Sequence, residues 1–279
     1  MKQKIRNNMN HLKTIFVIFV SLTIPAIVMA GDSSTELDSA IQGTHRDAAN
    51  VARDIYRHPK ETLMFFNMQA DMKVLEILPG RGWYTEILAP LLKDNGELTV
   101  ASFGDTHPTE YLRNIHINYI EILDANPDIY GNVKIVIFNK TGYLAEVPDN
   151  SMDIVVTFRN THNWIRYGGV EEIYAAFNRV LKPGGILGVV QHRANAGSEV
   201  KASAEKGYVP ESYLINMVED AGFELVKKSD VNANLKDSKD YPKGVWSLPP
   251  TYREKDKDRD RYTAIGESDR MTMKFIKLN

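Results

Sequence analysis

Short apolar runs of strand length alternate with longer, helix-like segments along most of the chain. Strand-like runs are expected at residues 74–78, 98–103, 133–138, 154–158, 186–191, 223–227 and 271–276. The main helix-like segments are expected at residues 84–93, 109–126, 170–181 and 210–220. This alternation is typical of a mostly parallel sheet, because every parallel connection needs a crossover that covers one face. We therefore predict an α/β fold, with a Rossmann-like sheet of seven strands and helices on both faces.

The first thirty residues have the features of a secretory signal peptide. Basic residues precede an apolar run at 15–28, and Val28 and Ala30 are small residues at the −3 and −1 positions of a cleavage site. The basic residues are Lys2, Lys4, Arg6 and Lys13. We expect cleavage after Ala30 and an exported, periplasmic or secreted protein. The alternative is an uncleaved N-terminal anchor.

Composition excludes several classes of function. The chain has no cysteine, which rules out disulfides, thiol catalysis and thiolate metal sites. Its formal net charge is −2, and removal of the four basic residues of the first thirty makes it more acidic. Because nucleic acid attracts basic surfaces, it is not expected as a partner. No other apolar stretch has membrane-spanning length, so we expect no membrane span after signal cleavage.

Residues 31–279 are predicted to form a single domain with two additions. The first addition is an N-terminal helical segment, residues 31–69, in which 31–45 are expected to be loose and 46–68 helical. The second is a polar insert, residues 229–269, between the last two strands. Trp246 and the following prolines make this insert a candidate lid.

A glycine turn follows the first expected strand. Gly80 and Gly82 allow tight bending, and the following helix would direct free N–H groups toward a ligand. A dinucleotide site would need a third glycine, where this chain has Thr85, and an acid at the end of the second strand, which residues 101–103 lack. A nicotinamide oxidoreductase is therefore disfavoured. Glu76 instead puts a carboxylate before the turn, where it can hold an ammonium group.

These residues carry a resemblance to a known family. The pattern Glu76-x-x-x-Gly80-x-Gly82 resembles motif I of class I S-adenosylmethionine (SAM)-dependent methyltransferases, and residues 177–185 (FNRVLKPGG) resemble a second signature of that family. Residues 80–90, 157–164 and 244–250 are similar to a family of exported bacterial predicted methyltransferases. The resemblance implies a class I methyltransferase fold with an antiparallel last strand, and methyl transfer from SAM to an unidentified small molecule or exported acceptor.

The resemblance also implies a cofactor site, with two departures. Leu78 replaces the first glycine of motif I, and we expect the turn from Pro79 to Gly82 to make the bend without it. The second strand lacks the acid that usually holds the ribose, which leaves Ser102, and Asn139 stands where an acid often meets adenine. The expected cofactor-binding residues are Glu76, Pro79, Gly80, Gly82, Tyr84, Thr85, Ser102 and Asn139.

Polar and aromatic side chains follow the fourth expected strand, and a second polar pair ends the fifth. Loops at the carboxyl ends of parallel strands are where catalytic groups usually lie. His162 and His192 are predicted to act as base and orienting group, and Arg159 offers a fork for a carboxylate or phosphate. Asn160 completes the predicted catalytic set. The predicted substrate residues are Asn163, Trp164, Arg193 and Trp246.

Two alternatives stay open for this loop and for the function as a whole. The loop residues can brace the backbone or cap the next helix, and two histidines make a thin ligand set for a metal, so no metal site is predicted. SAM is made in the cytoplasm, and the ribose and adenine positions depart from the family pattern. The chain is therefore also compatible with a non-catalytic protein that keeps the fold and binds another ligand.

Overall fold

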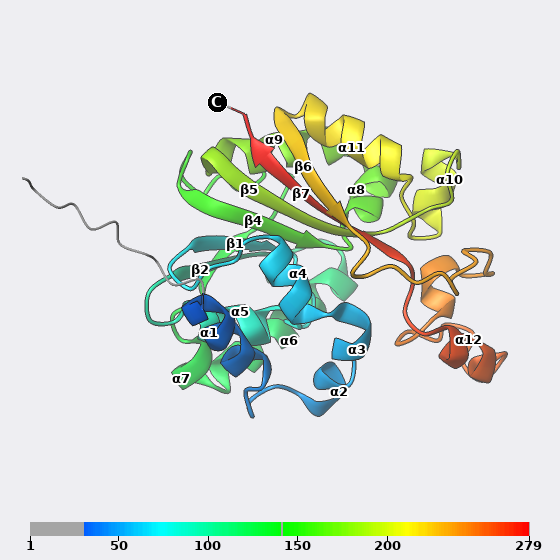
Figure 1. Cartoon of the computed structure of the whole chain (residues 1–279), viewed down its shortest axis with the longest axis horizontal. Coiled ribbons are helices and arrows are strands. Elements are labelled where there is room, and N and C mark those ends of the chain that lie inside the picture. Colours follow the sequence, from blue (N-terminus) through cyan, green and yellow to red (C-terminus); the bar gives the residue numbers. More distant parts are fainter. Residues whose placement is uncertain (1–30, 141, 279) are drawn as a thin grey trace, which may run out of the picture. The chain divides into compact units, whose positions relative to one another are not determined.

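The computed structural model describes residues 31–140 and 142–278, which form a seven-stranded sheet flanked by helices (Figure 1). The strand order is β3-β2-β1-β4-β5-β7-β6. The strands are β1 (Lys73–Ile77), β2 (Glu97–Ser102), β3 (Lys134–Ile137), β4 (Met152–Phe158), β5 (Leu181–His192), β6 (Phe223–Ser229) and β7 (Arg270–Lys277). β1 to β5 pair in parallel, and β7 runs antiparallel to both β5 and β6. The predicted fold class is confirmed.

The central strands are apolar because both of their faces are covered. In β1, Leu75 and Ile77 face one hydrophobic core and Val74 faces the other. Since side chains alternate along a strand, Glu76 points to the same side as Val74. Its neighbours there include α5 (Thr85–Leu92) and α6 (Glu110–Asp124). A carboxyl group is therefore placed inside an otherwise apolar layer.

Helices form a layer on each face of the sheet (Figure 1). One layer contains α8 (Thr161–Tyr167), α9 (Val170–Val180) and α11 (Glu211–Asp220). The other contains α1 (Gly31–Ile41), α4 (Pro59–Phe65), α5, α6 and α7 (Pro127–Tyr130). The remaining helices are α2 (Ala48–Val51), α3 (Asp54–Arg57), α10 (Val200–Glu205), the 3-10 helix η1 (Gly244–Ser247) and α12 (Arg259–Ile265).

The expectation of a loose segment over residues 31–45 is wrong for most of its length. Residues 31–41 form helix α1, whose Leu37 and Ala40 are buried in the core beside α5. The Ser/Thr/Asp-rich composition masked a short apolar stripe that Leu37, Ala40 and Ile41 make on one helical face. Tertiary burial, rather than intrinsic propensity, stabilises a helix of this length.

The segment between β6 and β7 has a small core of its own. Tyr241, Leu248 and Tyr262 are buried together within residues 229–269. Trp246 of η1 is half-buried, and the ring of Trp246 lies 5.8 Å from the ring of His162, measured between centroids. The segment therefore reaches the end of β4, where a lid would have to lie.

Most of the predicted site residues lie at one edge of the sheet. The parallel strands β1 to β5 all end there, and the antiparallel β7 begins there, so that His192 pairs with Arg270. Within residues 31–140 and 142–278, no helix combines the length and the apolar character that crossing a bilayer requires.

Candidate active site

The turn after β1 contains three left-handed backbone conformations. The φ angles are +50° at Leu78, +66° at Gly80 and +81° at Gly82. The turn is made without a glycine at position 78, but the bend is not confined to Pro79–Gly82, because Leu78 itself adopts a left-handed conformation. A side chain in this region costs roughly 1–2 kcal/mol, which is a physical reason for glycine to be favoured at position 78. Leu78 packs against the apolar core, which offsets part of that cost.

The two glycines of the turn meet different surroundings. A Cβ atom on Gly82 would lie 3.0 Å from the ring of Tyr119, so a side chain there is disfavoured by both φ and contact. A Cβ atom on Gly80 would meet nothing within 4 Å. Gly80 and Pro79 are half-buried. The chain therefore leaves open space beside Gly80, where a ligand can approach the backbone.

Glu76 is buried directly below this turn. It is 1% exposed, and its Oε2 atom accepts a hydrogen bond of 2.7 Å from the Thr85 hydroxyl. The same hydroxyl lies 3.1 Å from the Tyr119 hydroxyl. Burial raises the pKa of Glu76 to about 7, although the Thr85 hydrogen bond and the charge of Arg159 oppose the shift. A bound cation would supply the charge compensation that the carboxylate lacks.

Tyr84 belongs to the packing beneath the turn. Its ring stacks on Phe158 at the end of β4, with centroids 3.5 Å apart and planes at 11°. Burial also raises the pKa of the Tyr84 hydroxyl. Tyr84 and Thr85 therefore support the turn from below and have little surface to offer a cofactor, since both are buried.

Ser102 is the last residue of β2, and Asn139 lies two residues beyond β3; the buried Ser102 has a partner that was not predicted. The Ser102 hydroxyl lies 2.8 Å from Nδ1 of His116 on α6. Burial lowers the pKa of His116, so this imidazole is neutral at neutral pH. Asn139, beyond the end of β3, is exposed. His116 was not predicted; its position on the buried face of helix 109–126 was the available signal.

Arg159 occupies a left-handed conformation immediately after β4. Its φ is +65°, and its N–H donates to the carbonyl of Val190 on β5. The side chain is half-buried. Within residues 31–140 and 142–278, no group accepts a hydrogen bond from its guanidinium. Burial, with repulsion from Arg270, lowers the pKa of Arg159 to about 10.

The two asparagines of this loop brace the backbone. Nδ2 of Asn160 donates to the carbonyl of Ile77, at 2.9 Å, and to the hydroxyl of Thr157. This bond joins the loop after β4 to the end of β1. The Asn163 N–H donates to the carbonyl of Asn160, in the first turn of α8. The bracing alternative thus describes Asn160 better than a direct catalytic role.

His162 is a buried, neutral imidazole. Nε2 of Gln191 lies 3.2 Å from its Nδ1 and also 3.2 Å from the carbonyl of Gly207. Because a carbonyl only accepts, the Gln191 atom that contacts it must be the amide nitrogen, which donates. The same nitrogen therefore donates to Nδ1 of His162, and the proton of the neutral His162 ring lies on Nε2 of His162. Burial lowers the pKa of His162 to about 3. The prediction of His162 as a general base is therefore at odds with its tautomer, which makes it a hydrogen-bond donor.

His192 is the more available of the two histidines. Its ring lies 5.7 Å from that of His162, and its Nδ1 is 2.5 Å from the hydroxyl of Ser268. It is half-buried. Burial, followed by the proximity of His162 and Arg159, lowers its pKa well below the usual range. When Nδ1 of His192 donates to the Ser268 hydroxyl, Nε2 of His192 is unprotonated and can accept a proton.

Arg193 does not face a ligand. Its guanidinium donates to both carboxylate oxygens of Asp269 and to Asp230, and it approaches Glu211 at 3.5 Å. These hydrogen bonds raise the pKa of Arg193, with Asp269 contributing most. Because its donors are already directed at three carboxylates, the geometry gives Arg193 a structural role in place of the predicted substrate contact.

The two predicted tryptophans lie in different surroundings. Trp164 is 6% exposed and packs edge-on against Tyr174 and Phe177, in the core of the sheet. It has little surface for a substrate, contrary to the prediction. Trp246 is half-buried, and Arg253 lies 5.2 Å from its ring. Trp246 therefore remains a candidate wall of the crevice beside His162.

A buried cluster of arginines beside this edge was not predicted. Glu267 is paired with Arg53 at 2.7 Å, Arg57 at 3.4 Å and Arg270 at 2.9 Å. Burial opposes the charge of Glu267, but the three arginines outweigh it and lower its pKa to about 2. The available sequence signal was the spacing of Arg53 and Arg57, which puts two guanidinium groups one helical turn apart.

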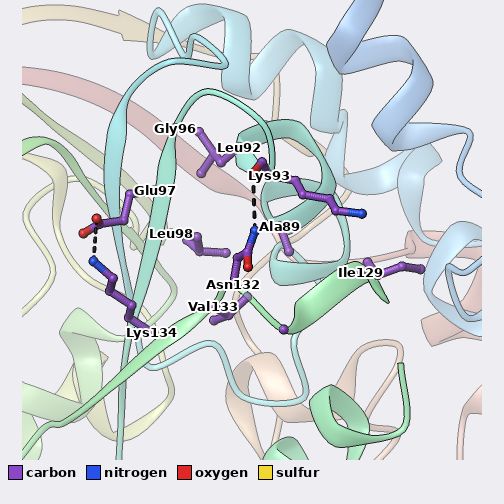
Figure 2. Close-up of a pocket in the computed structure, with 11 residues that line it drawn as sticks. Ala89, Leu92, Lys93, Gly96, Glu97, Leu98, Ile129, Asn132, Val133 and Lys134 are labelled. Atoms are coloured by element: carbon purple, nitrogen blue, oxygen red, sulfur yellow. Dashed lines mark hydrogen bonds and ion pairs between the residues drawn. The ribbon is translucent and has the colours of Figure 1, made fainter. Parts of the chain in front are cut away.

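A hollow of about 430 Å³ lies at the opposite edge of the sheet (Figure 2). Its lining includes Gly96 and Glu97 at the start of β2 and Lys134 at the start of β3, and Glu97 pairs with Lys134. Ligands of doubly wound sheets bind beyond the carboxyl ends of the strands, so this hollow is not the predicted site. Within the described part of the chain, no group of three His, Asp or Glu side chains is arranged to hold a metal ion.

Comparisons with known proteins identify the fold. No protein-family model and no curated protein matches this sequence. Among solved structures, a SAM-dependent methyltransferase from Aquifex aeolicus matches at 14% identity and a TM-score of 0.55, over 88% of this chain and 98% of that one. The [4+2]-cyclase SpnF matches at 16% identity and a TM-score of 0.57, over 88% and 93%. The YcgJ protein from Bacillus subtilis matches at 14% identity and a TM-score of 0.51, over 80% and 99%.

At these identities the likeness concerns the fold alone, and one neighbour is described as a cyclase. The same fold therefore occurs in proteins described by different chemistries, and function must be argued from the site. The strand order, the antiparallel β7 and these neighbours together show that the chain has the class I methyltransferase fold.

Proposed function

We propose that the protein binds SAM and transfers its methyl group to an acceptor that is a small molecule or an exported compound. The observation that carries the proposal is the buried Glu76 carboxyl group below a turn that leaves open space at Gly80. A carboxylate at this place favours a cationic ligand and repels a pyrophosphate. The fold of known SAM-dependent methyltransferases, such as the Aquifex aeolicus protein, supports the same cofactor.

Different residues around the turn bind different parts of the cofactor. Glu76 attracts the ammonium group, and the backbone near Gly80 accommodates the amino-acid chain. The nucleoside would lie over the ends of β2 and β3, beside the Ser102–His116 pair and Asn139. When bound, SAM supplies an electrophilic methyl group on a sulfonium, and its transfer leaves S-adenosylhomocysteine and, from a protonated acceptor, one proton.

His192 is the group proposed to take that proton. His162 is excluded from this role because Gln191 occupies its Nδ1 atom and its Nε2 atom is protonated. His162 and Ser268 instead position His192 from two sides. The half-buried Trp246, carried by the 229–269 segment, would close the crevice over the acceptor and exclude water.

Calorimetric titration of the purified protein with SAM and S-adenosylhomocysteine tests the cofactor. We expect saturable heat with both, and at least tenfold weaker binding in Glu76→Gln. The matched control is Glu97→Gln, which removes a carboxylate at the opposite edge of the sheet. No heat and no thermal shift with either compound at millimolar concentration would overturn the proposal.

A second candidate function is non-catalytic binding of another ligand. The neutral His162, whose Nδ1 is occupied by Gln191, and the buried Ser102–His116 pair favour it, because neither offers the base and ribose contacts expected of the family. Native mass spectrometry of the purified protein distinguishes the two. A co-purifying ligand other than SAM, together with no methyl transfer, would support the second candidate.

We also propose that the protein is exported and cleaved after Ala30. The proposal rests on the sequence of the first thirty residues, which lie outside the described structure. Intact-mass measurement of the protein from the periplasmic fraction of an expressing bacterium tests it. A protein retained in the cytoplasm with residues 1–30 in place would contradict it.

A further inference from the structure

The positive charge beside the candidate active site exceeds the negative charge that faces it. Arg53, Arg57 and Arg270 all pair with the single carboxylate of Glu267. Arg159 lies close enough to Arg57 and Arg270 for their positive charges to repel one another. The Arg159 guanidinium has no hydrogen-bond acceptor among the described residues. Four guanidinium groups thus face two carboxylates, those of Glu267 and of the buried Glu76, in a place where water compensates poorly for charge.

Donors in this cluster are left without partners. Arg57 is 4% exposed and Arg270 is 2% exposed, yet Nη1 of Arg57 and Nε of Arg270 have no hydrogen-bond partner. Burial lowers the pKa of Arg57, and the charge of Arg159 adds to the effect. An unpaired buried N–H is costly, and natural proteins usually satisfy such groups. Two unpaired donors thus belong to the same arginine cluster as the half-buried Arg159, and a bound anion is the kind of group that can satisfy them.

The backbone of Arg159 is held in a specific conformation at the end of β4. Its left-handed φ of +65° costs free energy for any residue with a side chain. Its N–H is tied to Val190, and Asn160 ties the next residue to the end of β1. The backbone that carries the Arg159 side chain is therefore fixed, and a guanidinium fork matches the two oxygens of a carboxylate or phosphate.

The surroundings of Arg193 differ from those of Arg159 and support an anion-binding role for Arg159. Arg193 lies at the end of the neighbouring strand β5 and is surrounded by the carboxylates of Asp269, Asp230 and Glu211. The chain therefore supplies acids to the arginine that has a structural role. Among the described residues it places no carboxylate within ion-pairing distance of Arg159, on which Glu267 and Glu76 act only from farther away, and Arg159 lies close enough to His192 to lower its pKa.

We propose that Arg159, with the unpaired donors of Arg57 and Arg270, binds an oxyanion of a bound ligand. This inference deepens the proposed function, because the oxyanion can be the carboxylate of the cofactor or a carboxylate or phosphate of the acceptor. In either case the bound anion would offset the field of the arginines on His192 and make His192 a stronger base. The subsite would thereby couple ligand binding to proton removal.

The test uses inorganic phosphate and acetate as probes, in the absence of SAM, with chloride at the same ionic strength as the reference. The melting temperature of the wild-type protein should rise with at least one probe in a saturable manner. Arg159→Asn should abolish that rise, because asparagine tolerates the left-handed backbone but has no charge. It should also raise the melting temperature in chloride, since it removes an uncompensated charge. Arg261→Gln, an exposed change on α12, is the control and should behave like the wild type.

Two further arms separate the sources of the anion. If it is the cofactor carboxylate, Arg159→Asn weakens S-adenosylhomocysteine at least tenfold but leaves 5′-methylthioadenosine, which lacks the amino-acid group, unchanged. If the anion belongs to the acceptor, S-adenosylhomocysteine binds equally to the wild type and to Arg159→Asn. The rise in melting temperature with phosphate or acetate then persists in the wild type at saturating S-adenosylhomocysteine. A wild-type protein that responds to neither probe, or a probe response that survives Arg159→Asn, would overturn the inference. Failure of SAM to bind while the probes do bind would reject the proposed function alone.

Discussion

Replacing Glu76 by glutamine separates the electrostatic cost of this carboxylate from its packing. Burial raises the pKa of Glu76 from 4.5 to about 7 in the folded chain. Such a group contributes stability that is fully present below pH 4.5 and is lost as the pH rises through 7. Since one pKa unit corresponds to about 1.4 kcal/mol, the loss at high pH is roughly 3 kcal/mol. Glutamine is neutral throughout and lacks this dependence.

The absolute stability of Glu76→Gln also reflects its new amide group, which needs an acceptor near Thr85. The informative quantity is therefore the change with pH of the difference between variant and wild type. Linkage predicts that the free energy of unfolding of the variant, relative to the wild type, rises by about 2.5 kcal/mol between pH 5 and pH 8. Urea denaturation at several pH values, without ligand, measures it.

The control for this series is Glu97→Gln, whose exposed ion pair with Lys134 is expected to contribute less than about 1 kcal/mol at either pH. A difference between Glu76→Gln and the wild type that stays within about 0.5 kcal/mol over the same range would refute the reasoning, since it would mean that Glu76 is as well solvated as a surface acid. Confirmation would mean that the folded chain retains a destabilising carboxylate, as functional sites often do.

Three further predictions concern stability. Gly82→Ala should destabilise by roughly 2–3 kcal/mol and Gly80→Ala by only about 1 kcal/mol, because both need a positive φ but only Gly82 also meets a ring; equal losses in urea titrations would contradict the contact argument. His162, whose pKa is lowered from 6.5 to about 3, binds protons more readily when unfolded, so stability falls as the pH drops below 6.5. His162→Gln should remove about 2 kcal/mol of the loss between pH 7 and pH 5, and an unchanged acid profile would contradict this. Trp164→Ala should cost roughly 3–5 kcal/mol as a core truncation. Trp246→Ala should cost about 1 kcal/mol or less and impair activity, and the opposite order of thermal stabilities would reverse the two roles.

The fold was accessible from the sequence because its signals are local. Apolar runs of strand length and helical stripes are visible within windows of ten to fifteen residues, and the long connection before β7 separates it from the other strands. The prediction was wrong for residues 31–41, which have a polar composition. They form a helix because Leu37 and Ala40 are buried against another helix. That burial is a tertiary contribution that no local propensity records.

The glycine turn and Glu76 could also be found in the sequence, since one strand and its following turn set their spacing. The partners could not. Thr85 was expected at the turn, but its link between Glu76 and Tyr119 depends on how α6 crosses the sheet. The pairing of His116 with Ser102 depends on the same crossing. Composition alone gives no sign of either contact.

The sequence by itself determined that this chain alternates strands and helices, that a carboxylate precedes a glycine turn, and that polar groups follow the fourth and fifth strands. Only the tertiary structure decided which of those groups are already paired. Arg193 forms ion pairs with three acids, whereas Arg159 forms none with the described residues, although the two differ little in sequence context. The pair of Arg53 with Glu267 joins residues 214 positions apart. Periodicity reports which face of an element is buried, whereas the partner across a buried face is set by strand order and crossovers, which bring distant segments together.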